Sequence, residues 1–468
     1  MDVLKQIHRK YNMYHKYSTI PLLILLPSAV ILIADPRRPQ ELKTAHDTGS
    51  SRNLALCHRT FSLHRRNRLS PSSRGESPAG TGVRRPSSLT SDEYLSMGRS
   101  LHRSLREDAV KNNLSSPFSE KNEENILRPF MGKYPFIPCT LRHYDAISFG
   151  TCLSRRLREK PSLDLFFIGD SKIRNIFGSF LNTTRAMDYN ISFMKEAETI
   201  KQLIELPWDQ FQATQDEKTI HQADQTATST IHPGLRVSFR FAQFWSRQQF
   251  RGSEERRLLL AWINGSLPPP DLVIIGYGSW TLYAPQYLML PLSNLDILHI
   301  LLRTHQVVGP LLQKLSRKTL VLFHAETRQR PRAMGKTPSS GKLFSRLAMF
   351  SDSLYDWSEM MLRYFLEKRS RDELWDKLLL PGRENLDGED AEGVWWWDST
   401  LPYHFASVLE CNDLHRRNLS HREEYLDPRN NCQDQIHAGA NTRYLEVTML
   451  LNLLCNSHVV HEDHFCCS

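Results

Sequence analysis

The sequence predicts an α/β fold in which a parallel sheet is covered by helices on both faces. Short apolar runs alternate along residues 131–468 with longer stretches whose apolar residues recur at helical spacing. Such alternation is typical of parallel sheets, because each connection between parallel strands has to cross a face of the sheet. The chain has 468 residues, of which 40% are apolar, so it is long enough to bury a substantial core.

The stretch LDLFFIGDSKIRNIFGSFL predicts the first strand and the first helix of this sheet. Leu163–Ile168 is a short apolar run that indicates a buried strand, and apolar residues then recur at helical spacing from Ile173 to Phe180. Ser171 therefore lies at a strand-to-helix turn. Further strands are expected at Leu235–Phe241, Leu272–Ile275 and Thr319–His324, and helices at Ser253–Trp262, Leu292–Arg317 and Leu343–Lys368.

Ser171 is the candidate nucleophile. A hydroxyl at such a turn projects beyond the end of the sheet, and the free N–H groups of the first helical turn can stabilise an oxyanion. The alternative interpretation is that Asp170 or Ser171 only caps the helix, which both residue types do well. Ser279 follows a predicted strand and His324 is the last residue of another, so both are expected at the same edge of the sheet.

A candidate base and its orienting acid lie near the C-terminus. Asp434 and His437 precede a helix-like run, Asn441–Cys455. A hydroxyl is a weak nucleophile until a base takes its proton, and a carboxylate can hold the histidine in the required tautomer. Asp413 and His415 also offer an acid and a histidine, but they are two residues apart and no periodic helix follows them. We therefore prefer Asp434 and His437.

Several segments interrupt the alternation of strands and helices. Residues 194–232 are polar and are interpreted as a long insertion. The run Trp395–Trp397 is either core or a platform on which a sugar could stack, and core is the commoner role of such residues. A histidine such as His324, at the end of a strand, is more often a capped loop residue than a catalytic one.

These residues resemble a known family. The chain is similar to the SGNH (GDSL-like) hydrolases, and within them to the PC-esterase branch, above all to the luminal N-terminal domain of the Golgi sialate O-acetyltransferase, the capsule synthesis one domain protein. The resemblance covers roughly residues 131–468. It is carried by Tyr134-Pro135, Cys139, Cys152, Gly169–Arg174 (GDSKIR), Pro270–Gly276 with Ser279-Trp280, Asp434–His437, Cys455-Asn456 and Cys466-Cys467.

The resemblance implies a three-layer, flavodoxin-like SGNH fold and an acyl transfer through a seryl intermediate. Ser171, Asp434 and His437 would form the triad, and the Ser171 N–H would be the first oxyanion donor. The family's usual second donor, an Asn, is missing, and Gly278, Ser279 or Arg174 could replace it. No metal site and no bound cofactor are expected.

The implied reaction is O-acetylation of a sugar hydroxyl, for which the acceptor would be sialic acid or its nucleotide-activated form. Acetyl-CoA would be the ultimate acetyl donor, delivered by a multi-spanning membrane module that follows the luminal domain in the related enzyme. The chain ends at Ser468 without such a segment. An O-acetyl esterase with the same triad, and a membrane-anchored protein that keeps the fold without catalysis, are the alternatives.

The N-terminal part of the chain divides by composition. Residues 1–17 are basic, and residues 18–34 are uncharged. The uncharged run is interpreted as a signal anchor in preference to a cleaved signal peptide or a buried helix, with the basic end in the cytosol. The family that the chain resembles also begins with such an anchor, and the resemblance implies that the remainder of the chain lies in the Golgi or another secretory compartment. Residues 35–130 are rich in Ser, Arg and Pro and are expected to be a disordered linker.

The net charge of the protein and its cysteines indicate which partners and which cellular compartment to expect. The net charge is +9, but the arginines of the linker lack interleaved aromatic residues, so a nucleic-acid partner is not expected. No cysteine pair has the close spacing typical of zinc sites, and behind a signal anchor disulfides are the better interpretation. The expected pairs are Cys139–Cys152, Cys411–Cys432 and Cys455 with Cys466 or Cys467, with Cys57 left alone in the linker. Glycosylation sequons begin at Asn113, Asn182, Asn190, Asn264 and Asn418.

Overall fold

The structure is a computed structural model, and all of the residues that it describes belong to one compact unit, residues 47–468. The described residues are 57–63, 89–112, 132–197, 200–214, 223–242, 247–278, 281, 293–325, 354–363, 366, 393–417, 437–459 and 464–468. The predicted basic head and signal anchor, residues 1–34, lie outside them. Within the described parts of the chain, no helix is long and apolar enough to cross a membrane.

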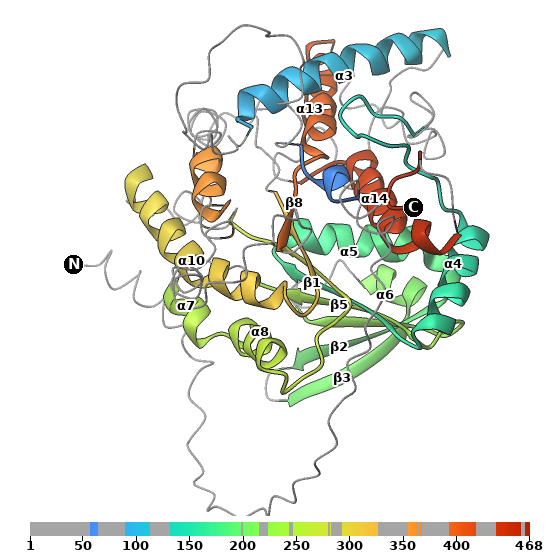
Figure 1. The fold of residues 1–468 in the computed structure, drawn as a ribbon, viewed down its shortest axis with the longest axis vertical. Helices are drawn as coiled ribbons and strands as arrows, with labels where there is room; N and C mark the ends of the chain where they lie inside the picture. The colour runs from blue at the N-terminus through green and yellow to red at the C-terminus, as the bar shows by residue number, and fades with distance from the viewer. Residues whose placement is uncertain are drawn as a thin grey trace, which may run out of the picture. The chain divides into compact units, whose positions relative to one another are not determined.

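A central sheet organises this unit (Figure 1). The strands run in the order β3-β2-β4-β5-β1-β6-β7-β8. Their bounds are β1 Leu163–Gly169, β2 Tyr189–Ala197, β3 Ile200–Pro207, β4 Gln225–Ser229, β5 Leu235–Phe241, β6 Leu272–Gly276, β7 Leu320–His324 and β8 Val394–Trp397. The helices are α3 Ser91–Lys111, α4 Ala146–Glu159, α5 Ser171–Thr183, η4 Arg185–Met187, α6 Trp208–Thr214, α7 Arg247–Gly252, α8 Glu254–Asn264, α10 Asn294–Leu315, α13 Leu401–Arg416 and α14 Ala440–Val459.

The parallel part of the sheet agrees with the prediction. β5, β1, β6, β7 and β8 are parallel neighbours, and the expected strands near residues 163, 235, 272 and 320 are β1, β5, β6 and β7. The register aligns Gly169 with Gly276 and His324 with Trp397, so the carboxyl ends of these strands lie at one edge. The Trp395–Trp397 run is strand β8, and its three side chains are buried, so the interpretation as core is confirmed.

The remainder of the sheet differs from the prediction. Residues 194–232 were expected to be an insertion, but they complete β2 and supply β3, α6 and β4, which extend the sheet with antiparallel strands. The sheet is therefore mixed rather than purely parallel. Alternate residues of β2, namely Tyr189, Ile191 and Phe193, are buried, and this period of two gives the strand one apolar face despite its polar composition.

Helices cover both faces of the sheet, as predicted. Phe166 and Phe167 are adjacent in β1 and therefore point to opposite faces. The Phe166 ring packs against Trp262 of α8, with centroids 4.9 Å apart, whereas the Phe167 ring packs against Phe177 of α5, at 5.8 Å. On the α8 face, α7, α8 and α10 contact one another, and on the α5 face α4 and α5 contact α14.

The linker prediction over residues 35–130 is wrong for residues 57–63 and 89–112, which pack into the hydrophobic core. α3 lies against α13 (Figure 1) and starts with a capping box formed by Thr90 and Glu93. The helix carries an apolar stripe at helical spacing, and it buries this stripe although its overall composition is polar. Its buried side chains include Tyr94, Leu101, Leu105 and Ala109.

A buried carboxylate joins these N-terminal segments to the sheet. Asp398, directly after β8, accepts hydrogen bonds from the Tyr94 hydroxyl at 2.6 Å and from the Leu63 N–H at 2.8 Å. Arg363 donates to the same carboxylate at 3.0 Å. Asp398 is fully buried, so these contacts replace the water that its carboxylate would otherwise bind.

The disulfides differ from the expected local pairs and join distant segments. Cys57 bonds Cys467, Cys139 bonds Cys466, and Cys152 bonds Cys455. The pairings Cys139–Cys152 and Cys455 with Cys466 or Cys467 are therefore wrong, and Cys57 is not alone. Cys411 is also disulfide-bonded, but Cys432 lies outside the described residues, so that pairing stays a prediction.

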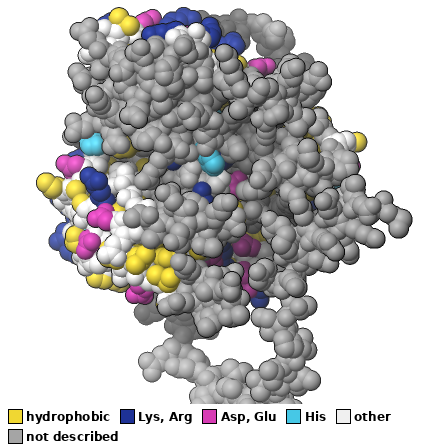
Figure 2. All heavy atoms as spheres, turned by 180° about the vertical axis from the view of Figure 1, so that it is seen from behind, with side chains coloured by type: hydrophobic (Ala, Val, Ile, Leu, Met, Phe, Trp, Pro, Cys, Tyr) yellow, Lys and Arg dark blue, Asp and Glu magenta, His cyan; other side chains and the backbone are white. Residues whose placement is uncertain are grey.

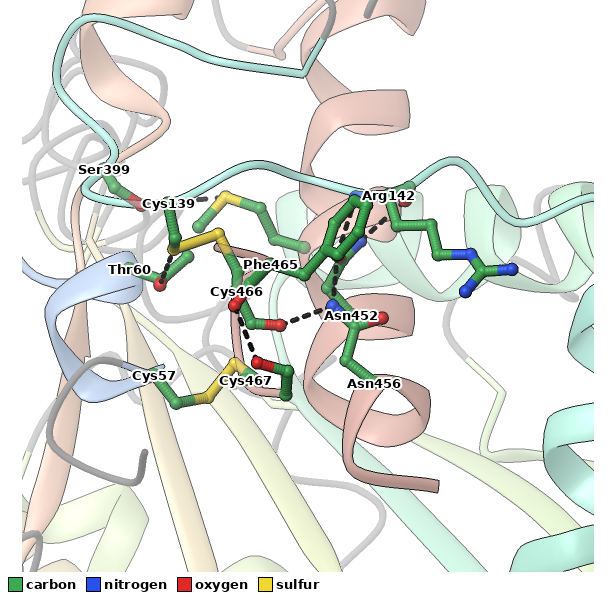
Figure 3. The surroundings of a disulfide bond; sticks show 12 residues. Cys57, Thr60, Cys139, Arg142, Ser399, Asn452, Asn456, Phe465, Cys466 and Cys467 are labelled. Carbon is green, nitrogen blue, oxygen red and sulfur yellow. Dashed lines mark hydrogen bonds between the residues drawn. A yellow bond between two sulfur atoms is a disulfide. The ribbon is translucent and has the colours of Figure 1, made fainter. Parts of the chain in front are cut away.

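The C-terminal tail explains this pattern. Thr140 and Phe465 form a parallel bridge, which places Cys466 beside Cys139 (Figure 3). Asn456 of α14 donates to the Cys466 carbonyl, and Asn452 holds the backbone of Arg142 through its N–H and its carbonyl, both at 2.8 Å. The neighbouring cysteines 466 and 467 thus anchor two different N-terminal segments to the last helix.

The described surface mixes charged and apolar side chains. In the view of Figure 2, Lys and Arg side chains lie near Asp and Glu side chains, with hydrophobic side chains among them. The exposed large hydrophobic residues come from several separate elements. They are Val110, Ile147, Leu203, Ile231, Leu267, Leu295, Trp357 and Met360.

Candidate active site

Ser171 is the first residue of α5, directly beyond the end of β1. Asp170 caps the helix, because its carboxylate accepts the Lys172 N–H at 2.9 Å. Gly169 has to be glycine here, since a Cβ at that position would lie 2.2 Å from the Gly276 carbonyl oxygen of the neighbouring strand. The close approach of β1 and β6 therefore sets the turn, and Asp170 takes the capping role that the alternative interpretation had offered to either residue.

His437 contacts the Ser171 hydroxyl. Its Nε2 lies 2.7 Å from Ser171 Oγ, and both side chains are half-buried. That distance is within the range that a general base needs to take the proton of a nucleophile. The structure thus brings together two residues that the sequence had singled out at opposite ends of the domain.

Helix packing positions this pair. His437 lies shortly before α14, and α14 packs along α5, whose first residue is Ser171 (Figure 1). The Cys152–Cys455 disulfide ties α14 to α4 on its other side. The distance between the histidine and the serine therefore depends on how α14 docks onto α5 and not on local sequence.

Asp434, the expected acid, and Ser279, one of the oxyanion candidates, both lie outside the described residues. Their roles stay predictions.

The other oxyanion candidates lie close to this edge in the fold. Gly278 follows β6, the strand next to β1, and has a φ of 129°, a conformation that only glycine adopts readily. Arg174 is three residues after Ser171 and therefore shares its face of α5. Burial lowers the pKa of the Arg174 guanidinium, and the neighbouring Asp170 carboxylate opposes that shift.

The second acid–histidine pair considered from the sequence lies on another helix. Asp413 belongs to α13 and forms ion pairs with Arg106 of α3 and with Arg416 and Arg417. It thus helps to hold α3 against α13, a structural role that explains its charge.

His324 has a partner that the sequence reasoning missed. Its Nε2 lies 2.9 Å from Glu446 Oε1, and both side chains are buried, with 3% and 1% of their surface exposed. The His324 ring also meets Trp397 edge-on at 5.0 Å. Glu446 is the only carboxylate in the run Asn441–Cys455 that was predicted to be the last helix, and a carboxylate among so many apolar residues is the signal that could have revealed it. The pair links the end of β7 to α14.

Buried polar groups also lie behind the end of β6. Tyr277 Oη is 3.1 Å from His305 Nδ1 on α10, and His305 Nε2 is 2.9 Å from Ser358 Oγ. No group of three or more His, Cys, Asp or Glu side chains that could hold a metal ion occurs in the part of the chain that the structure describes.

Comparisons with known proteins add little to this geometry. No protein-family model matches the chain, and no curated protein matches it. Among solved structures, one described as "Peptidoglycan O-acetylesterase in action, 5 min" aligns with a TM-score of 0.29 and 10% sequence identity, over 65% of this chain and 95% of that chain. A likeness at that TM-score supports neither a fold nor a function, so the argument for function has to come from the site itself.

Proposed function

We propose that the protein is a serine acyltransferase that moves an acetyl group through a covalent intermediate on Ser171 to a sugar hydroxyl. The observation that carries this proposal is the 2.7 Å contact between His437 Nε2 and Ser171 Oγ at the carboxyl edge of the parallel strands. Active sites of open α/β sheets lie at that edge. A serine nucleophile needs an adjacent general base, and a histidine in contact with its hydroxyl can act as that base.

The first half of the reaction forms the acetyl-enzyme. Ser171 Oγ attacks the acetyl carbonyl carbon while its proton passes to His437 Nε2. The tetrahedral intermediate then collapses, and the departing oxygen takes that proton from Nε2. Asp434 would accept the Nδ1–H of His437, which leaves Nε2 free to receive the proton.

The negative charge of the tetrahedral intermediate needs hydrogen-bond donors. The N–H of Ser171 lies in the first turn of α5, where backbone N–H groups have no acceptor within the helix and the helix dipole favours negative charge. Gly278, Ser279 and Arg174 remain the candidates for a second donor. Gly278 is favoured because β6 is adjacent to β1 and ends level with it.

The second half of the reaction distinguishes a transferase from an esterase. An acceptor hydroxyl gives its proton to His437 Nε2 and attacks the acetyl carbon, after which Ser171 recovers the proton. We propose sialic acid or its nucleotide-activated form as acceptor, on the resemblance of GDSKIR and the C-terminal segments to the PC-esterase branch. Water in place of the sugar makes the protein an O-acetyl esterase, which is the second candidate.

The same resemblance motivates the setting of the reaction. Acetyl-CoA is proposed as the ultimate donor, with a multi-spanning membrane partner that supplies acetyl groups. The proposed location is a Golgi or other secretory membrane, with residues 18–34 as a single-pass anchor and the catalytic domain in the lumen. The disulfides are compatible with an oxidising compartment.

The test compares acetyl turnover in the wild type and in Ser171→Ala, with an activated acetyl ester as donor. Loss of the nucleophile should lower kcat by roughly three orders of magnitude or more. Mass spectrometry should find an added acetyl group on the Ser171 peptide of the wild type, and His437→Ala should slow both its formation and its release. If Ser171→Ala turns over like the wild type, the serine mechanism is wrong.

Ser253→Ala is the matched control. Ser253 caps α8 by accepting the Arg256 N–H, so its loss should cost about 1 kcal/mol of stability without affecting acetyl turnover. Adding sialic acid or its nucleotide-activated form then separates the two candidates. Faster loss of the acetyl-enzyme with acetylated sugar as product establishes the transferase, whereas release of acetate at an unchanged rate establishes the esterase.

A further inference from the structure

Three buried polar side chains, those of Tyr277, His305 and Ser358, form a hydrogen-bonded chain that begins at the residue before Gly278. Tyr277 follows the last residue of β6, and its ring packs edge-on against Phe323 at 5.4 Å. Its hydroxyl contacts His305 of α10, and His305 contacts Ser358. The exposed fractions of Tyr277, His305 and Ser358 are 2%, 1% and 7%, so the chain is shielded from solvent along its whole length.

The hydrogen-bonded chain formed by these three side chains is not a second catalytic site. Burial lowers the pKa of His305 to about 3 and raises that of Tyr277 well above 10. The imidazole is therefore neutral and the phenol keeps its proton near neutral pH, so neither is poised to exchange protons with a substrate. A neutral imidazole has one donor and one acceptor nitrogen, and both are used here, which makes the chain a fixed link between three elements.

The last of those elements also contacts the start of α5. Ser358 lies in the helical residues 354–363, and Tyr355 of the same segment places its ring 5.6 Å from Lys172 Nζ. Lys172 directly follows Ser171. Tyr355 also packs in a cluster with Ile297 and Leu301 of α10. Residues 354–363 therefore contact the side chain of Lys172 directly and that of Tyr277 through His305. These two residues adjoin Ser171 and Gly278, the two positions whose backbone N–H groups could donate to an oxyanion.

The conformation of Gly278 makes such a link useful. Its φ of 129° lies in a region that glycine enters easily but also leaves easily, because no Cβ restrains it. A donor N–H helps catalysis only if its direction is set before the charge develops. Holding the Tyr277 hydroxyl fixes the residue whose carbonyl forms the peptide bond with the Gly278 nitrogen.

We propose that Tyr277, His305 and Ser358 are positioning residues that hold the Tyr277–Gly278 peptide so that the Gly278 N–H is the second oxyanion donor. This inference rests on the proposed serine mechanism, and it names the donor that the sequence left open. Ser279 and Arg174 are thereby assigned no part in binding the oxyanion.

The experiment uses Tyr277→Phe, which removes the hydroxyl but keeps the ring. Turnover is measured with a matched acetyl ester and thionoacetyl ester, because sulfur accepts hydrogen bonds more weakly than oxygen and gains less from an oxyanion donor. We expect kcat for the oxygen ester to fall roughly 10- to 100-fold, with KM changed less than about threefold. The preference for the oxygen ester over the thionoester should fall by about tenfold or more.

Tyr189→Phe is the matched control. Tyr189 is an equally buried tyrosine whose hydroxyl lies 2.8 Å from Thr184 Oγ1. It belongs to β2, which β4 and β5 separate from β1 in the sheet. It should lose a similar amount of thermal stability but keep the ester preference of the wild type. A general loosening of the fold would lower activity in both variants and leave the ester preference unchanged, which would overturn the proposal.

Ser358→Ala keeps the test decisive if Tyr277→Phe does not fold. Removing the Ser358 hydroxyl breaks the hydrogen-bonded chain at its other end. We expect the preference for the oxygen ester to fall by about threefold, less than in Tyr277→Phe, because the Tyr277–His305 contact remains. If Ser171→Ala abolishes turnover but neither Tyr277→Phe nor Ser358→Ala changes the ester preference, the positioning role is wrong while the serine mechanism stands. If Ser171→Ala itself retains full activity, the mechanism fails first.

Discussion

His324 Nε2 lies 2.9 Å from Glu446 Oε1, and this buried contact joins the end of β7 to the helix that follows His437. On its other side the same helix is held by the Cys152–Cys455 disulfide and by the Asn452 contacts with Arg142. α14 is thus fixed along both flanks. Since its start carries the candidate base toward Ser171, the stability of the fold and the alignment of the site depend on the same contacts.

The first prediction concerns this pair. Glu446→Ala leaves His324 buried without its partner, and we expect the free energy of unfolding to fall by about 3 kcal/mol. Urea denaturation measures the change. Glu254→Ala is the control, because Glu254 pairs with Arg257 on an exposed stretch of α8, where such pairs contribute less than about 0.5 kcal/mol. Equal losses in the two variants would show that the His324–Glu446 contact does not stabilise the fold.

The second prediction concerns the disulfides. Because cysteines 466 and 467 are adjacent, digestion without reduction should yield one species in which their peptide is linked to both the Cys57 and the Cys139 peptides. A separate species should join the peptides of Cys152 and Cys455. Mass spectrometry of peptides from the unreduced protein provides the measurement. A Cys139–Cys152 cross-link would contradict the described arrangement.

The third prediction concerns α3. Leu101→Ala removes a side chain that is 2% exposed and should lower the free energy of unfolding by about 2–4 kcal/mol. Val110→Ala, on the same helix at 72% exposure, should change it by less than about 0.5 kcal/mol. The comparison is made by chemical denaturation of the two variants and the wild type. Two indistinguishable variants would mean that α3 does not pack on the domain in solution.

The fourth prediction is a pH dependence that arises from His305. Burial lowers its pKa from 6.5 to about 3, so between these values the unfolded chain binds a proton that the folded chain does not. Stability therefore falls as the pH drops below 6.5, by about 2 kcal/mol at pH 5 from this residue alone.

His305→Asn should remove that part of the acid sensitivity. The difference in unfolding free energy between wild type and variant should shrink by about 2 kcal/mol from pH 8 to pH 5, as measured by urea midpoints. His299 is an exposed histidine on the same helix, and His299→Gln should leave the pH dependence of the unfolding free energy as it is in the wild type. If the His305→Asn slope also matches the wild type, the buried imidazole does not titrate as described.

The local elements around Ser171 could be predicted from the sequence, because their signals are local. A short apolar run, a Gly-Asp-Ser turn and a helical spacing specify β1, the capped turn and α5 within a few residues. β5, β6 and β7 followed from the same kind of pattern. The Asp-x-x-His segment before a helix-like run pointed to His437, but only the packing of α14 on α5 places its Nε2 at Ser171 Oγ.

Contacts between distant segments were decided by the tertiary structure. Cys57 and Cys467 are 410 residues apart, and their pairing depends on how the C-terminal tail lies against Thr140. The apolar stripe of α3 was hidden by the polar composition of that helix, and β3 and β4 were hidden by their polar faces. Each element needs only one apolar face once it has a neighbour to cover it. Sequence patterns report what a segment can form, whereas its partner is chosen by the burial available in the whole fold.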